Sequence, residues 1–350
     1  MDHVITIADR RIGPGSPCFV IAEAGVNHNG DVGLAVKLID AAVAAGADAV
    51  KFQSFRADEL ASRSAPKAGY QMADGAPGES QWDMLKRLEF GQVEFARLKD
   101  YCERVGIIFL SSPFDVASVD LLEGLGVAAL KIPSGELTNH ALLERAARSG
   151  KSILMSTGMC EMEEVAEAVA VIERSGAAQL ALLHCVSTYP AAAENCNLRA
   201  MATMRDRFGV PVGFSDHTLG ADVAIAATAL GADVIEKHLT LDRSMNGPDH
   251  AASMEPGAFG EMVKSIRRAA SALGDGVKGM AEVERANREV VRRSVVLNVD
   301  LAAGVTIERS HLSSCRPAGG IRPEEMESVV GKRTARAIKA REMLHWSDLV

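Results

Sequence analysis

Aromatic residues are scarce in this chain, and no segment of it is apolar for long. Aromatic side chains make up 4% of the 350 residues, although 47% of the residues are hydrophobic. No run approaches the ~18 consecutive apolar residues that a membrane-spanning helix needs. The first ten residues, MDHVITIADR, contain no apolar signal core. We therefore expect a cytoplasmic protein without a membrane partner.

Basic blocks and paired cysteines are also missing. The formal net charge is -8 and no basic block appears, so a nucleic-acid partner is not expected. The six cysteines form no C-x-x-C pair and no zinc-like spacing. Reduced, partly buried thiols are the expected state of such cysteines in a cytoplasmic protein. A disulfide framework and a structural zinc site are therefore not expected.

What the chain does contain is a repeating order of helix, glycine and apolar strand. In AAVAAGADAVKFQSF (41–55) and AATALGADVIEKHL (226–239), an Ala-rich stretch ends near a glycine and an apolar run follows. Glycine suits a helix C-cap, and a short apolar run suits a strand that is covered on both faces. Eight strands of this kind are predicted, at 18–25, 49–54, 107–112, 129–135, 152–158, 180–187, 210–217 and 233–239.

Eight parallel strands with intervening helices predict an α/β fold, a (β/α)8 TIM-type barrel. An open doubly wound sheet is the alternative, but no G-x-G-x-x-G motif follows the first strand. We expect the barrel at residues 1–278, with a long insertion at 56–89 that acts as a lid or binding loop. A charged, helical linker is expected at 279–291, and a small, mostly β domain at 292–350.

Polar residues gather where the predicted strands end. The carboxyl ends of barrel strands carry the catalytic groups of TIM-type enzymes. Taken singly, each residue has an ordinary explanation, because lysines extend to solvent, serines cap helices and histidines form structural hydrogen bonds. Their occurrence at all eight strand ends favours a functional site. The residues are Glu23, Lys51, Gln53, Ser111, Ser112, Lys131, Ser134, Ser156, Thr157, His184, Ser187, His217, Glu236 and His238.

These residue types predict an anion site, and two of the histidines form a candidate metal site beside it. Lysine supplies point charge to phosphate or carboxylate, while hydroxyls and helix N-termini supply directed donors. His217 and His238, on neighbouring strands, suit a divalent metal with open coordination positions. The carboxylates Glu23, Glu136 and Asp249 are available for proton transfer or for binding hydroxyl groups. Phosphoryl transfer and carbonyl condensation both fit this set.

Motifs along nearly the whole chain resemble those of the sialic acid synthase family. They include IAEAGVNHNGD, GADAVKFQSF, KIPSGELTN, HCVSTYP, GFSDHTLG and IEKHLTLDRSMNGPDHAAS. The tail, RRSVV…CRPAGGI, resembles the SAF domain, a module similar to type III antifreeze proteins. The resemblance therefore implies a (β/α)8 barrel followed by a small, β-rich C-terminal SAF domain.

The resemblance also implies a reaction. Members of the family condense phosphoenolpyruvate with an N-acetylmannosamine-type sugar to a nine-carbon α-keto acid and phosphate. The implied cofactor is a divalent metal held by His217 and His238, with Mn2+ expected and Mg2+ or Co2+ as alternatives. Glu23 and Glu136 join these histidines as catalytic groups. The implied substrate-binding residues are Lys51, Lys131, Ser134, Ser156 and Ser187 for phosphoenolpyruvate, and Gln53, Tyr189, Asp249 and Arg316 for the sugar.

The implied assembly is a domain-swapped homodimer, because Arg316 matches an arginine that reaches the active site of the neighbouring subunit.

Two departures from the family's motifs concern the identity of the sugar. Val186 stands where sialate-forming members often carry a polar residue, and Ala191 stands where many have a second proline. N-acetylneuraminate synthase is the first interpretation. The alternatives are N,N'-diacetyllegionaminate synthase, which acts on a 2,4-diacetamido-6-deoxy sugar, and pseudaminate synthase.

Two rival classes remain open. A 3-deoxy-sugar-phosphate synthase is also a metal-dependent barrel enzyme, but it needs an additional phosphate site and leaves the C-terminal domain unexplained. A non-catalytic carbohydrate-binding or ice-binding role would rest on the C-terminal domain alone. The polar residues at the barrel strand ends argue against such a role, and release of phosphate from phosphoenolpyruvate would exclude it.

Overall fold

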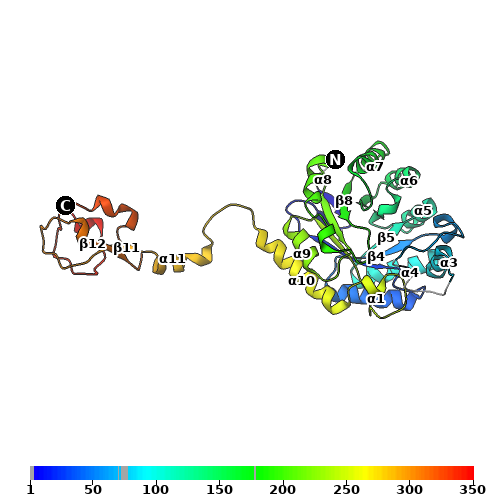
Figure 1. Cartoon of the computed structure of the whole chain (residues 1–350), viewed down its shortest axis with the longest axis horizontal. Helices are drawn as coiled ribbons and strands as arrows, with labels where there is room; N and C mark the ends of the chain where they lie inside the picture. The colour runs from blue at the N-terminus through cyan, green and yellow to red at the C-terminus, as the bar shows by residue number, and fades with distance from the viewer. Residues whose placement is uncertain (1–3, 70, 72–77, 177–178) are drawn as a thin grey trace. The chain divides into compact units, whose positions relative to one another are not determined.

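The computed structural model describes residues 4–69, 71, 78–176 and 179–350 (Figure 1). The chain divides into two compact units, Met1–Gly274 and Asp275–Val350. Within the described residues, no helix combines the length and the apolar character that crossing a membrane requires.

The first unit is built around eight parallel strands. They are β3 (Phe19–Gly25), β4 (Ala49–Ser54), β5 (Ile108–Pro113), β6 (Ala129–Ile132), β7 (Ser152–Ser156), β8 (Leu180–Cys185), β9 (Val212–Asp216) and β10 (Val234–His238). Their order in the sheet is β5-β4-β3-β10-β9-β8-β7-β6, and β5 packs beside β6, so the sheet curves into a nearly closed barrel. The predicted (β/α)8 architecture is confirmed, and a strand lies within or close to each predicted range.

Helices connect the strands and surround the barrel (Figure 1). They are α1 (Val32–Ala45), α4 (Gln92–Val105), α5 (Val116–Gly124), α6 (His140–Arg148), α7 (Met162–Arg174), α8 (Ala200–Phe208), α9 (Asp222–Ala229) and α10 (Pro256–Leu273). Asp31 caps the N-terminus of helix α1, and its carboxylate accepts from two backbone N–H groups of the first turn. It ends at Gly46, which has a φ of 78° and takes the C-cap role that the sequence predicted.

A short hairpin fills the amino-terminal end of the barrel. Its strands are β1 (Ile5–Ile7) and β2 (Arg10–Ile12), which pair antiparallel. Ile5, Ile7 and Ile12 are fully buried and pack against apolar side chains from the beginnings of the barrel strands. No sequence pattern predicted this hairpin, because strands of three residues are too short to show a periodicity.

The insertion after β4 carries two further helices, α2 (Ala57–Leu60) and α3 (Gln81–Leu88). Met84 and Leu88 of α3 are buried against Val26 and Phe55, which lie at the ends of β3 and β4. The insertion is therefore anchored to the carboxyl end of the barrel, where the sequence placed a binding loop. Tyr70 and residues 72–77, which belong to that predicted loop, lie outside the described residues.

The second unit is small and rich in short β elements, as predicted. Strand β11 (Ser294–Leu297) pairs antiparallel with β12 (Leu312–Cys315) over a buried apolar core that includes Val295 and Ile307. The predicted helical linker is shorter than expected, because helix α11 covers only Arg285–Val291, after a 3-10 turn at Glu282–Glu284. Gly276 and Gly279 precede it, and glycine disfavours a helix interior.

The barrel-closing hairpin yields a stability prediction. Ile7→Ala should lower the free energy of unfolding by about 2–5 kcal/mol, because it leaves a cavity among fully buried side chains. Thr6→Ala is the matched control, since its side chain is exposed and its hydrogen bonds use the backbone, so it should change stability by about 0.5 kcal/mol or less. Urea denaturation measures both. Equal losses of unfolding free energy in Ile7→Ala and Thr6→Ala would show that the hairpin does not seal the barrel.

Candidate active site

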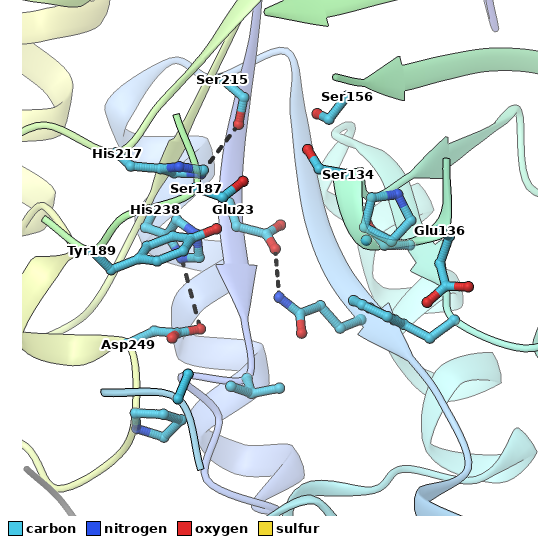
Figure 2. Close-up of a pocket in the computed structure, with 18 of the residues that line it drawn as sticks. Glu23, Ser134, Glu136, Ser156, Ser187, Tyr189, Ser215, His217, His238 and Asp249 are labelled. Atoms are coloured by element: carbon cyan, nitrogen blue, oxygen red, sulfur yellow. Dashed lines mark hydrogen bonds and ion pairs between the residues drawn. The ribbon is translucent and has the colours of Figure 1, made fainter. Parts of the chain in front are cut away.

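The carboxyl ends of the barrel strands open into a cavity of ≈ 450 Å³. Figure 2 shows two histidines, Tyr189 and Asp249 on one side of it and Ser134, Ser156 and Glu136 on the other. Every barrel residue predicted for the site lines the cavity: Glu23, Lys51, Gln53, Lys131, Ser134, Glu136, Ser156, Ser187, Tyr189, His217, His238 and Asp249. Arg316 is exposed in the second unit, and its place in another subunit's site stays a prediction.

Four buried charges form the floor of the cavity. Lys51 Nζ lies 3.0 Å from Glu23 Oε2 and 3.6 Å from Glu236 Oε1. Lys131 Nζ lies 3.6 Å from the same Glu236 oxygen. None of the four residues is more than 5% exposed. The two lysines and two carboxylates neutralise one another, which is the condition under which such groups remain buried.

Burial and pairing separate the pKa values of the two carboxylates. Burial raises the pKa of Glu23 to about 7, against the opposing effect of Lys51. Burial also acts to raise the pKa of Glu236, but Lys131 and Lys51 outweigh it and lower the pKa to about 2. Burial lowers the pKa of Lys131, while the adjacent carboxylates raise that of Lys51 despite its burial. Glu236 is thus a fixed negative charge, and Glu23 is able to hold or release a proton near neutral pH.

Hydroxyl groups and a glycine form a cradle beside Lys131. The Lys131 ammonium donates to Ser156 Oγ at 2.6 Å. The Gly158 N–H donates to Ser134 Oγ at 2.9 Å, and Cys185 Sγ lies 3.2 Å from the same oxygen. Because Ser134 Oγ accepts from a backbone N–H, its own proton is directed either to Cys185 Sγ or to a ligand. Hydroxyl donors next to an ammonium are suited to phosphate or carboxylate oxygens.

Two neutral imidazole rings lie across the cavity from this cradle. His217 Nδ1 is 2.7 Å from the Val186 carbonyl oxygen, which can only accept, so Nδ1 carries the proton and Nε2 keeps its lone pair. Burial lowers the pKa of His217 to about 4, and it lowers that of His238 well below the usual value. The two ring centroids are 5.7 Å apart, and the Tyr189 ring lies 4.2 Å from that of His217.

The pair of histidines fits a divalent metal. His238 Nδ1 is buried without a hydrogen-bond partner among the described residues, and Asp249 Oδ2 lies 4.0 Å from it. A buried polar nitrogen usually has a partner, so an unpartnered one indicates a missing ligand. Neutral imidazole nitrogens bind divalent metals well. Within the described part of the chain, no three or more His, Cys, Asp and Glu side chains converge on one metal position. Water or substrate oxygens would therefore complete the coordination.

Asp249 is held over the cavity by a chain of hydrogen bonds. Asn27 Nδ2 donates to Leu239 O and to Ser253 Oγ, both at 2.9 Å. Ser253 Oγ in turn donates to the backbone oxygen of Asp249 at 2.6 Å. Burial raises the pKa of the Asp249 carboxyl to about 6. The loop after β10 is thereby fixed to the loop after β3, and Asp249 faces the two histidines.

Three polar side chains surround the open face of Gly25. A Cβ atom at this residue, whose φ is 53°, would lie 3.3 Å from Glu23 Oε1, 3.4 Å from Gln53 Nε2 and 3.6 Å from Asp249 Oδ2. Gln53 Nε2 also donates to Glu23 Oε1 at 3.1 Å. Two carboxylate acceptors and an amide donor around one space are suited to hydroxyl groups of a ligand.

Some strand-end candidates do not reach the cavity. Ser111 Oγ is 2.6 Å from Ser54 Oγ, and His184 Nε2 is 2.7 Å from the Cys196 carbonyl oxygen. Thr157 donates to a backbone carbonyl of β8. Lys237 points away from its neighbours on β10 and pairs with buried Asp216 at 2.7 Å. These residues have structural roles, because strand alternation directs them to the helix side of the barrel or to its loops.

Ser112 and Glu236, two strand-end candidates to which the sequence assigned no role, also line the cavity, and so does Ser215, which was not a candidate. Ser112 accepts from Lys51 Nζ at 2.9 Å, and Ser215 donates to Glu236 at 3.1 Å. Strand alternation gives a signal for Ser112, Ser215 and Glu236, since they share a face with predicted site residues. Alternation also relates Cys185 to Ser187, two residues further on, whereas the apolar residues of α3 carry no such signal. Only the tertiary structure brings them to the cavity.

A barrel with a charged mouth and paired neutral histidines is the architecture of a TIM-type enzyme. The NeuB family matches residues 38–278, and the SAF domain matches residues 292–350. The chain belongs to the NeuB family. It is an enzyme of the nonulosonic acid synthase class.

Named relatives cover nearly the whole chain. The N,N'-diacetyllegionaminic acid synthase of Legionella pneumophila is 45% identical over 96% of this chain and 96% of its own length. The enzyme of the same name from Campylobacter jejuni is 45% identical over 93% of this chain and 98% of its own. The N-acetylneuraminic acid synthetase of Leptospira borgpetersenii, solved with citrate, is 36% identical and has a TM-score of 0.72, covering 82% of this chain and 95% of that one.

The cradle yields a prediction for Gly158. A methyl group there would overlap Ser187 Oγ and would lie 2.7 Å from Cys185 Sγ and 3.0 Å from Ser134 Oγ. Gly158→Ala should therefore weaken binding of inorganic phosphate about tenfold or more, as expected when a charge-assisted hydrogen bond is lost. Calorimetric titration measures this. Gly257→Ala is the control, because an added Cβ there meets nothing within 4 Å. If the two variants bind phosphate with equal affinity, the cradle is not a phosphate site.

Proposed function

We propose that this protein condenses phosphoenolpyruvate with the open-chain form of an N-acylated amino sugar, giving a nine-carbon α-keto acid and phosphate. The reaction class, a phosphoenolpyruvate-dependent carbon–carbon bond-forming synthase, follows from membership of the NeuB family. The observation that carries the proposal is that one cavity combines an anion cradle, two neutral histidines and a hydroxyl-binding group.

Phosphoenolpyruvate fits the side of the cavity that β4, β6, β7 and β8 form. Lys51 and Lys131 supply positive charge, and the hydroxyls at 134, 156 and 187 supply directed donors. Because Glu23 and Glu236 already balance the lysines, each new anion oxygen needs a hydroxyl or backbone donor as well as charge. The cradle around Ser134 provides such donors.

The chemistry needs a bond between C3 of phosphoenolpyruvate and the aldehyde carbon of the sugar, whose oxygen takes up a proton. Water then adds at C2 and loses a proton. The bond from C2 to the phosphate oxygen breaks as the new C2 hydroxyl loses its proton, which leaves the keto group and free phosphate. Glu23 and Glu136, whose pKa values burial raises, are the carboxyls available to hold and transfer these protons.

We propose Mn2+ as the cofactor, with Mg2+ or Co2+ as alternatives, held by His217 and His238. When bound, such an ion supplies Lewis-acid polarisation of a carbonyl oxygen. The unpartnered Nδ1 of His238 and the unprotonated Nε2 of His217, which lies 3.4 Å from Ser215 Oγ, support this assignment. Tyr189 packs against the His217 ring and restricts its orientation.

Three activities that differ in the sugar are candidates, and the third, pseudaminate synthase, is supported by a relative named pseudaminic acid synthase from Campylobacter jejuni at 33% identity. The first candidate sugar is N-acetylmannosamine, which would make the protein an N-acetylneuraminate synthase. The relatives named N,N'-diacetyllegionaminic acid synthase, at 45% identity, support a 2,4-diacetamido-6-deoxy sugar at least as well. Gln53, Asp249 and Glu23 around Gly25 are the groups that would bind hydroxyls of either sugar.

A direct assay tests the proposal. The protein is incubated with phosphoenolpyruvate, Mn2+ and each candidate sugar, and released phosphate and the mass of the keto acid are measured. Phosphate should appear only when an amino sugar is present. Arabinose 5-phosphate is the control for a 3-deoxy-sugar-phosphate synthase, and turnover of it alone would replace the proposal with that activity.

The metal assignment yields a separate prediction. His238→Ala should abolish tight Mn2+ binding in calorimetry and lower turnover by about 10²–10³-fold, the usual effect of removing one strong electrostatic contributor. His217→Ala should do the same, and a chelator should reduce the wild type to a similar level. His184, which bonds to a backbone carbonyl away from the cavity, gives the matched control variant His184→Gln. Full activity of the chelated protein would refute the metal role.

The proposed domain-swapped homodimer can be tested by complementation. Arg316→Ala should mainly raise the KM for the sugar, and His238→Ala should lower turnover by about 10²–10³-fold. If Arg316 of one subunit completes the site of the other, mixing the two variants under subunit exchange should restore a site with both residues intact. Activity that stays at the sum of the separate variants would contradict the cross-subunit role.

A further inference from the structure

A buried ion pair lies directly behind the two candidate metal-binding histidines. Asp216 ends β9 and directly precedes His217, and the strand register places it beside Lys237. Lys237 of β10 directly precedes His238. Its Nζ lies 2.7 Å from Asp216 Oδ2, and neither residue is more than 3% exposed. Because successive side chains of a strand point to opposite faces, the ion pair lies on the helix side of the barrel, whereas both histidines line the cavity.

The residue after His217 completes the contacts of this pair. Asp216 Oδ1 accepts from the backbone N–H of Thr218 at 2.8 Å and from its hydroxyl at 2.7 Å. Lys237 Nζ also donates to the Thr218 carbonyl oxygen at 2.7 Å. The chain on both sides of His217 is therefore bonded to β10. The two strand ends cannot shift along each other without breaking buried, charge-assisted hydrogen bonds, which are the strong ones.

The loop after β8 holds His217 from the other side. Its Val186 carbonyl oxygen lies 2.7 Å from His217 Nδ1, and its Ala191 N–H donates to the His217 carbonyl oxygen at 2.9 Å. The Tyr189 ring lies between 4 and 6 Å from both histidine rings, at 4.2 and 5.6 Å (Figure 2). On His238, by contrast, Nδ1 is buried without a hydrogen-bond partner in the part of the chain that the structure describes. The link between β9 and β10 therefore has to supply the alignment of the two rings.

Burial makes this ion pair better suited to alignment than to stability. Removal of two charges from water is costly, and their attraction offsets the cost only if the geometry is good and the remaining hydrogen bonds are made. Well-packed apolar side chains of similar volume are often at least as stable. An ion pair that joins two strands, one residue before each candidate metal ligand, is better explained by the position that it enforces.

We propose that Asp216 and Lys237 are positioning residues, which fix the separation and orientation of the His217 and His238 rings and thereby the affinity of the site for a divalent metal. The inference rests on the proposed metal site and adds two residues that do not line the cavity. Loss of an outer partner of a metal ligand usually lowers metal affinity by about 10- to 100-fold. We expect about tenfold here, because the pair acts through the backbone and not on the rings directly.

The test separates alignment from folding by removing one charge or both. Lys237→Met leaves a buried carboxylate without its counter-charge, so its urea midpoint should fall clearly. Asp216→Asn combined with Lys237→Met removes both charges and should bring the midpoint back towards the wild-type value. The Mn2+ affinity of this double variant, measured by calorimetry on the full chain, should nevertheless remain about tenfold below that of the wild type. Asp216→Asn alone, which keeps the bonds between Lys237 and Thr218, is a further variant if the double variant does not fold, and it should also bind Mn2+ more weakly.

Arg205 and Asp233 form the matched control, because they pair at 3.2 Å near the opposite, amino-terminal ends of the same two strands. Asp233 there accepts from the N–H of Val212, the first residue of β9, at 2.9 Å. Arg205→Met combined with Asp233→Asn should leave Mn2+ affinity unchanged, whatever its effect on the urea midpoint.

Two results would overturn the inference and leave the metal site standing. One is that the Asp216 and Lys237 double variant binds Mn2+ as tightly as the wild type. The other is that both double variants lose the same affinity, which would show that the pair contributes only to folding. If the wild type itself does not bind Mn2+, the metal assignment falls, and the inference falls with it.

Discussion

The buried charge cluster of Lys51, Lys131, Glu23 and Glu236 is the constraint on which the rest of the site depends. Each of these ions costs several kcal/mol to remove from water, so the cluster is stable only if every charge has a counter-charge or a donor nearby. Ser112 and other hydroxyls supply such contacts. The hairpin of β1 and β2 closes the barrel below, which leaves the mouth as the open side from which a ligand meets these charges.

This arrangement divides the cavity by chemistry. The cradle around Ser134 and Gly158 is rich in donors and lies next to a lysine. The space over Gly25 is surrounded by acceptors and an amide, and the insertion contributes aliphatic side chains to the cavity. An anionic ligand matches the cradle, and hydroxyl groups of a ligand match the space over Gly25. The neutral histidines lie where the two substrates would meet.

Strand alternation made much of the site predictable. In β10, Glu236 and His238 share the inner face and Lys237 takes the outer one, and β4 repeats this pattern around Phe52. The same reasoning failed where no period exists. The three-residue strands of the hairpin and the start of α11 have no pattern that differs from that of other short segments.

The sequence by itself determined the barrel, the β-rich second unit and the polar strand ends, because helix and strand periodicity and family motifs are local properties of the chain. Only the tertiary structure decided which polar groups meet. The pKa difference between Glu23 and Glu236 depends on distances to Lys51 and Lys131, and these distances follow from strand order around the barrel. Met84, Leu85 and Leu88 likewise line the cavity only because α3 folds back over the mouth, since burial is a property of packing and not of spacing along the chain.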